Sequence, residues 1–151
     1  MPQIDEHLKW CLKDPKRLIK TKPDLDLAQK HIKKSEYNYG VVQTLERLKT
    51  YDWAFNIGFY AIYHCFLAIL AKYGYESRNQ ACTITVLHTL IKDKKLNLDK
   101  DLITQFDTLD VEKNITNPTV RERREHSTYG VETSIDLILK VQREKIRILE
   151  E

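Results

Sequence analysis

Arg121 and His126, near the carboxyl end of the chain, are the residues whose types and spacing are best suited to chemistry. They lie in the segment Val120 to Tyr129, with four residues between them. Arginine presents a permanently charged fork to phosphate oxygens, and histidine exchanges a proton near neutral pH. The pair therefore predicts metal-free cleavage of a phosphodiester, with Arg121 holding the phosphate and His126 transferring the proton.

The spacing of this pair predicts a site shared between two copies of the chain. On a helix with about 100° per residue, Arg121 and His126 lie about 140° apart, on either side of a face centred on Tyr129. Glu122 falls on the same face, where it and Tyr129 would shape the site. One copy alone offers an incomplete site. Two copies packed around a twofold axis would gather two arginines and two histidines into one cleft, so we expect a homodimer.

A structural interpretation of the same segment stays open. The run Arg121 to Glu125 mixes basic and acidic residues, which is typical of a solvent-exposed helix face held by local ion pairs. Arg124 falls on the stripe of Val131 and Ile135, so we expect it to point towards the core and meet a carboxylate or backbone carbonyls. On this interpretation the protein is a helical interaction module and not an enzyme.

The composition is that of one globular helical domain spanning residues 1–151. Hydrophobic residues make up 42% of the chain and charged residues 31%, with only four glycines and four prolines. So few turn-forming residues favour long helices with short connections. The net charge of +3 is too small to indicate nucleic-acid binding by bulk electrostatics. A contact with RNA would need a local patch, and basic runs at residues 13–22 and 92–95 are the candidates.

Hydrophobic periodicity and turn residues predict where the helices lie. Asn117-Pro118 has the residue types of a helix start, and Gly74 those of a helix end. Gly40 marks a potential kink. We expect an all-α fold, an antiparallel up-and-down bundle of about four main helices plus short extra helices. The expected helices are Ile4 to Lys13, Asp24 to Lys49, Trp53 to Lys72, Ala81 to Lys92, Asp99 to Leu109, and a last one from Asn117 towards the carboxyl end.

Several other features narrow the expected functions. The uncharged segment 54–71 contains Asn56 and His64, so we expect a helix buried on two faces and not a membrane span. The three cysteines cannot all pair, and we interpret them as reduced thiols of a cytoplasmic protein. Histidines and cysteines lack metal-ligand spacing and no glycine-rich phosphate loop is present, so we expect no metal and no cofactor. His7 and His31 are expected at the surface and His88 partly buried.

Two parts of the chain resemble the HEPN domains (higher eukaryotes and prokaryotes nucleotide-binding). Phe59 to Leu70, followed by Lys72-Tyr73-Gly74, is similar to that family's central helix, in which an aromatic-Tyr-Ala-x-aromatic-His run precedes small and apolar residues and a glycine. Arg124 to Tyr129 resembles the Arg-x-x-small-x-Tyr pattern of the last helix. Arg121 to His126 matches the Arg-x(4–6)-His signature of RNA-cleaving members. The resemblance covers roughly residues 25–149.

This resemblance implies a helical bundle that dimerises through the face holding the motif. RNA-cleaving members are metal-independent endoribonucleases, often toxins restrained by a partner nucleotidyltransferase or another antitoxin. On that pattern Arg121 and His126 are the catalytic pair, and Glu122 stands where active members often carry Asn, Asp or His. His64 is expected to be a core or interface histidine. Many relatives lack the signature and serve as binding or assembly modules, which is the alternative function here.

Overall fold

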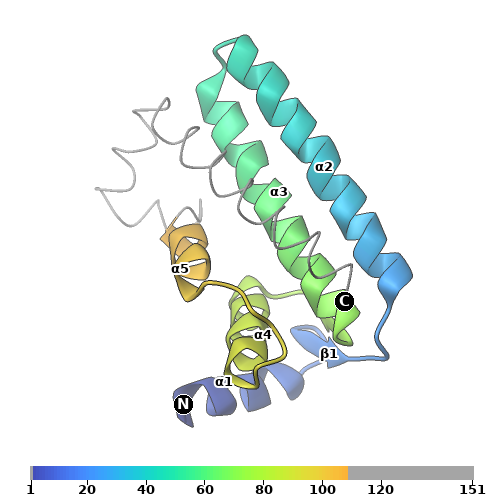
Figure 1. The fold of residues 1–151 in the computed structure, drawn as a ribbon. Helices are drawn as coiled ribbons and strands as arrows, with labels where there is room; N and C mark the ends of the chain where they lie inside the picture. Colours follow the sequence, from blue (N-terminus) through green and yellow to red (C-terminus); the bar gives the residue numbers. More distant parts are fainter. Residues whose placement is uncertain (1, 109–151) are drawn as a thin grey trace. The chain divides into compact units, whose positions relative to one another are not determined.

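The computed structural model describes residues 2–108, and this part of the chain is mostly helical (Figure 1). The two longest helices, α2 and α3, pack antiparallel. Two short strands form a small sheet. The elements are α1 (Pro2–Leu12), β1 (Leu18–Lys20), α2 (Leu25–Arg47), α3 (Tyr51–Lys72), β2 (Tyr75–Ser77), α4 (Gln80–Lys92) and α5 (Lys100–Thr108).

The helices within the described residues begin and end where local residue types predict. Asp24 caps α2, since its Oδ1 accepts a hydrogen bond from Leu27 N at 2.9 Å. Asn79 caps α4 in the same way, accepting from Cys82 N at 3.1 Å. Gly74 follows α3 with φ of +85°, and a Cβ there would lie 2.6 Å from Thr21 O. Only glycine fits that position, which confirms its predicted role as the helix end.

Gly40 does not interrupt its helix, because α2 continues through it from Leu25 to Arg47. The expected all-α fold needs one correction. Strands β1 and β2 pair antiparallel, with Leu18 opposite Ser77 and Lys20 opposite Tyr75. Each strand has three residues, too short to show an alternating pattern in the sequence.

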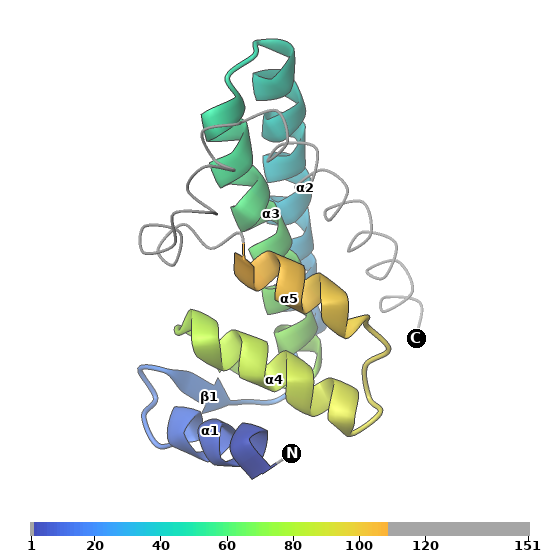
Figure 2. The ribbon, with the colours of Figure 1, turned by 90° about the vertical axis from the view of Figure 1, so that its left-hand side faces the viewer.

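The described chain divides into two compact units. The first contains Met1–Ile32 and Phe66–Lys100. In it α1 lies against both β1 and α4 (Figure 2). A disulfide joins Cys11 of α1 to Cys82 of α4, so the prediction of three reduced thiols is wrong for these two. Cys65 is buried and is not part of this disulfide; its Sγ lies 3.0 Å from Ser35 Oγ.

The second unit contains Lys33–Cys65 and the chain from Asp101 onwards, described to residue 108. Its core is apolar and aromatic. Phe106 of α5 is fully buried and stacks on Phe59 of α3, with ring centroids 4.5 Å apart. A smaller cluster joins Val42 of α2 to Ala54 of α3. Packing between neighbouring helix faces therefore holds this unit together.

Helix α3 is long and apolar enough to cross a membrane by length and composition alone. In the structure 67% of its most apolar window is buried inside the protein. Its exposed large side chains are Trp53 and Tyr60. This burial agrees with the expected helix that is buried on two faces.

Candidate functional site

Most of the predicted catalytic site lies outside the described residues. This holds for five of its residues, Arg121, Glu122, Arg124, His126 and Tyr129. Their roles therefore stay predictions. His64, the remaining supporting residue, lies in α3, where it is partly buried and makes contacts with its surroundings.

The helix segment that carries the family resemblance divides between an inner and an outer face. Phe59, Ala61 and Ile62 are buried. Tyr60 is 51% exposed, and His64 lies one helical turn further along the same side of α3. The aromatic-Tyr-Ala-x-aromatic-His run thus anchors the helix by its inner residues. On the side that Tyr60 and His64 share, the tyrosine is exposed and the histidine is partly buried.

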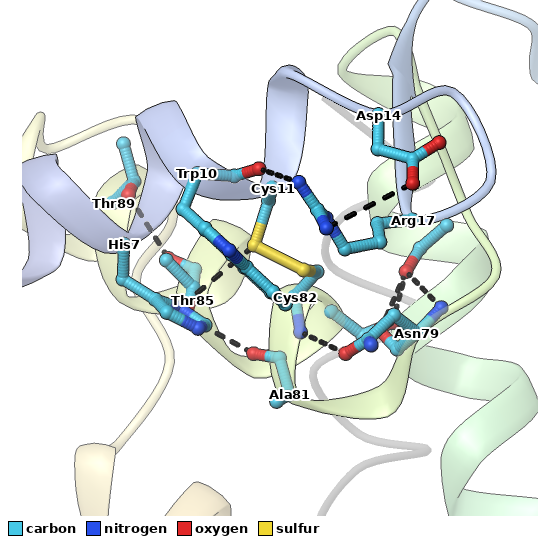
Figure 3. Close-up of a disulfide and its surroundings, with 12 residues drawn as sticks. His7, Trp10, Cys11, Asp14, Arg17, Asn79, Ala81, Cys82, Thr85 and Thr89 are labelled. Carbon is cyan, nitrogen blue, oxygen red and sulfur yellow. Dashed lines mark hydrogen bonds and ion pairs between the residues drawn. A yellow bond between two sulfur atoms is a disulfide. The ribbon is translucent and has the colours of Figure 1, made fainter.

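A second group of polar and aromatic side chains surrounds the disulfide in the first unit (Figure 3). His7 Nδ1 lies 2.6 Å from Thr85 Oγ1. The Thr85 hydroxyl also lies 3.0 Å from Ala81 O, so it is within hydrogen-bond distance of both the His7 ring and the backbone of α4. The His7 ring also stacks on Trp10, with centroids 5.3 Å apart. His7 is partly buried, so its expected surface position is met only in part.

Arg17 is committed to contacts within the protein. Its guanidinium lies 3.7 Å from the centre of the Trp10 ring, and its Nη2 donates to Trp10 O at 2.7 Å. Its Nη1 lies 3.8 Å from Asp14 Oδ2. In the sequence, Arg17 is one of the basic residues of the run 13–22, and its neighbours along the chain do not indicate that it has a structural role. The structure assigns it to holding the turn after α1 (Figure 3).

A hollow of about 380 Å³ also opens in the first unit, lined by Ile4, His88, Lys92 and Lys100. His88 is partly buried there, as predicted. Lys92 Nζ lies 2.6 Å from Asp5 Oδ1. This hydrogen bond lowers the pKa of Asp5 and raises the pKa of Lys92. Lys92, one of the two lysines that line the hollow, therefore has its charge paired within the protein.

His31 is half-buried in α2, and burial lowers the pKa of its imidazole. The expected surface position of His31 is therefore met only in part. Among residues 2–108, no group of three histidine, cysteine or acidic side chains is arranged to hold a metal ion.

No protein-family model matches the chain, and neither a curated protein nor a solved structure does. The motifs quoted above thus carry the family resemblance on their own.

Proposed function

We propose that the protein is a metal-independent endoribonuclease of HEPN type, acting as a homodimer in the cytoplasm. The observation that carries the proposal is one chain holding both the Arg121-x4-His126 signature and the Phe59 to Gly74 run, in the family's order. The antiparallel pair α2 and α3 is consistent with it, because α3 contains most of that run. We further propose that the helix from Asn117 completes an up-and-down bundle with these two.

The chemistry follows from the two residue types. One His126 accepts the proton of a ribose 2′-hydroxyl, whose oxygen then attacks the adjacent phosphorus. The bond to the 5′-oxygen breaks, and the His126 of the second copy donates a proton to that oxygen. The products are a 2′,3′-cyclic phosphate and a 5′-hydroxyl. Arg121 binds the phosphate and stabilises the charge that develops in the transition state.

The supporting residues have secondary roles in the proposal. Tyr129 orients the phosphate or the histidine, and Arg124 holds the helix against the core. His64 packs in the core or at the dimer interface. Glu122 accepts hydrogen bonds but repels phosphate, so Glu122→Asn is expected to raise the cleavage rate. An antitoxin, for instance a nucleotidyltransferase, would restrain such an enzyme in the cell.

The test is incubation of purified protein with total RNA in excess chelator. Wild type should give fragments with cyclic phosphate ends, whereas His126→Ala and Arg121→Ala should give none. Arg47→Ala is the matched control, because Arg47 is an exposed arginine of α2 whose side chain contacts Thr44. It should cleave as wild type does. Circular dichroism and dimer mass must be unchanged in all variants. Intact RNA with the wild type would contradict the proposal.

The second candidate function is a non-catalytic module that binds a nucleotidyltransferase-like or other protein. The exposed aromatic residues of the second unit favour it: Trp53 is 59% exposed, Tyr60 51% and Tyr37 66%. Trp53 and Tyr60 are seven residues apart and so lie on one side of α3. A stoichiometric companion that co-purifies with wild type, but not with Trp53→Ala, together with intact RNA, would favour this function.

A further inference from the structure

Positive charge is concentrated in one short stretch of the first unit. Residues 9–22 include six basic residues and one acidic residue, a net charge of +5, whereas the whole chain has +3. The remainder of the protein is therefore slightly acidic. Five lysines of this stretch are exposed, and we call the four that follow Cys11 the lysine ribbon: Lys13, Lys16, Lys20 and Lys22.

The charges of the lysine ribbon are not neutralised locally. Within residues 2–108, no carboxylate lies at ion-pair distance from any of the four lysines. Asp14, the acidic residue of the stretch, pairs with Arg17. The second basic run, at residues 92–95, differs in this respect. It includes Asp93, and its Lys92 is paired with Asp5.

The backbone beneath the lysine ribbon is fixed at several points. The disulfide ties Cys11 to α4 just before the ribbon begins. Asp14 then organises the turn, because its Oδ1 accepts from Lys16 N at 2.9 Å and its backbone oxygen from Arg17 N at 2.8 Å. Strand β1 is paired with β2, and Thr21 N donates to Gly74 O at 2.7 Å. A charged ligand would meet lysines on a preorganised backbone, which lowers the entropic cost of binding.

We propose that the lysine ribbon binds the phosphate backbone of single-stranded RNA. The identity of the polymer rests on the proposed function, because four exposed lysines without carboxylate partners among the described residues select only for a polyanion. Lysine ammonium groups contact phosphates as point charges and carry no base readout. Trp10 already stacks on His7 and Arg17. The Tyr75 ring lies 5.9 Å from the Lys20 ammonium, so neither nearby aromatic ring is free for a base. Binding is therefore independent of RNA sequence.

The probe for the test is a fluorescent oligouridine of about 20 nucleotides, in chelator, with every protein carrying His126→Ala to prevent cleavage. The test variant replaces all four ribbon lysines by glutamine. The control replaces four exposed lysines that lie outside both basic runs by glutamine: Lys30, Lys33, Lys34 and Lys49. Both variants have the same net charge, so they separate a local surface from overall electrostatics.

Four phosphate contacts on a single strand give a slope of about −3 for log affinity against log salt. The His126→Ala protein with its lysines intact should therefore lose about 60-fold in affinity between about 50 mM and about 200 mM salt. The ribbon variant should bind at least about 10-fold more weakly at low salt and lose most of that slope. The control variant should stay within about threefold. An oligocytidine probe should give the same values.

Three results would overturn the inference. Equal losses in the ribbon and control variants would assign binding to overall charge. If the protein with intact lysines does not bind RNA, then RNA is not the ligand of the lysine ribbon. Binding to phosphatidylserine vesicles at a salt concentration that abolishes RNA binding would assign the lysines to a membrane surface.

The same measurements separate this inference from the proposed function. If wild type leaves RNA intact but the ribbon variant loses RNA binding, the nuclease proposal fails and the binding surface stands. If wild type cleaves RNA and the ribbon variant binds RNA as tightly as the protein with intact lysines, the proposed binding surface is contradicted and the nuclease proposal is supported.

Discussion

Both compact units have apolar cores, but only in the first does the described structure add a covalent link. There α1 is joined to the rest by a disulfide, an ion pair and side-chain hydrogen bonds, among them the contact of His7 with Thr85. In the second unit, aromatic and aliphatic side chains from neighbouring helices supply the core, and Phe106 stacks on Phe59. The first unit should therefore respond to reductant and pH, and the second to loss of buried apolar volume.

The largest effect should come from the second unit. Phe106→Ala removes a fully buried ring stacked on Phe59, and such truncations cost about 3–5 kcal/mol of unfolding free energy. Urea denaturation measures the loss. Trp53→Ala is the control, because that side chain is 59% exposed and should change stability by less than about 0.5 kcal/mol. Similar losses for both variants would contradict the aromatic core described for this unit.

Reduction of the disulfide should produce the next largest effect, in the first unit. Cys11 and Cys82 are 71 residues apart, and closing so long a loop restricts the unfolded chain, for a stabilisation of about 2–4 kcal/mol. Unfolding of the oxidised protein with and without a phosphine reductant measures it. The Cys11→Ala/Cys82→Ala variant should not respond to reductant. Three titratable thiols in the unfolded, unreduced protein, instead of one, would refute the bond.

A smaller effect tests the polar contact inside the second unit. Ser35 is fully buried, and its hydroxyl donates to Ala61 O at 2.6 Å. Ser35→Ala should lower the unfolding free energy by about 1 kcal/mol. Thr44→Ala is the matched control, since the Thr44 hydroxyl makes the same kind of bond, to Gly40 O, at an exposed position. A loss as large as that of Phe106→Ala would show that polar contacts dominate this unit as well.

The smallest effect should be the pH dependence of the Asp5–Lys92 pair. The pKa of Asp5 is lowered from 3.8, so its contribution is present above that pH and lost as pH falls through the lowered pKa. The pKa of Lys92 is raised from 10.5, so the contribution is also lost as pH rises above that value. The stability difference between wild type and Asp5→Asn should vanish in acid. A constant difference down to pH 2 would contradict the pairing.

Local signals in the sequence were sufficient for the helices. Asp24, Asn79 and Gly74 each cap or end a helix through contacts with close neighbours in the chain or through backbone conformation, which residue type alone indicates. The two strands were missed because each is short and its partner lies far along the chain. Of the candidate site, only His64 falls among the described residues, so Arg121 and His126 remain predictions from spacing and chemistry.

The sequence by itself determined which segments of residues 2–108 form helices, because helix periodicity and end residues act over a few positions. Only the tertiary structure decided how the side chains are used. In the folded protein Cys11 and Cys82 are the two of the three cysteines that form a disulfide. Arg17 packs on the Trp10 ring, whereas its neighbour Lys16 is exposed. These pairings depend on which residues from distant parts of the chain come within bonding distance of one another. The residue pattern of a single segment does not contain this information.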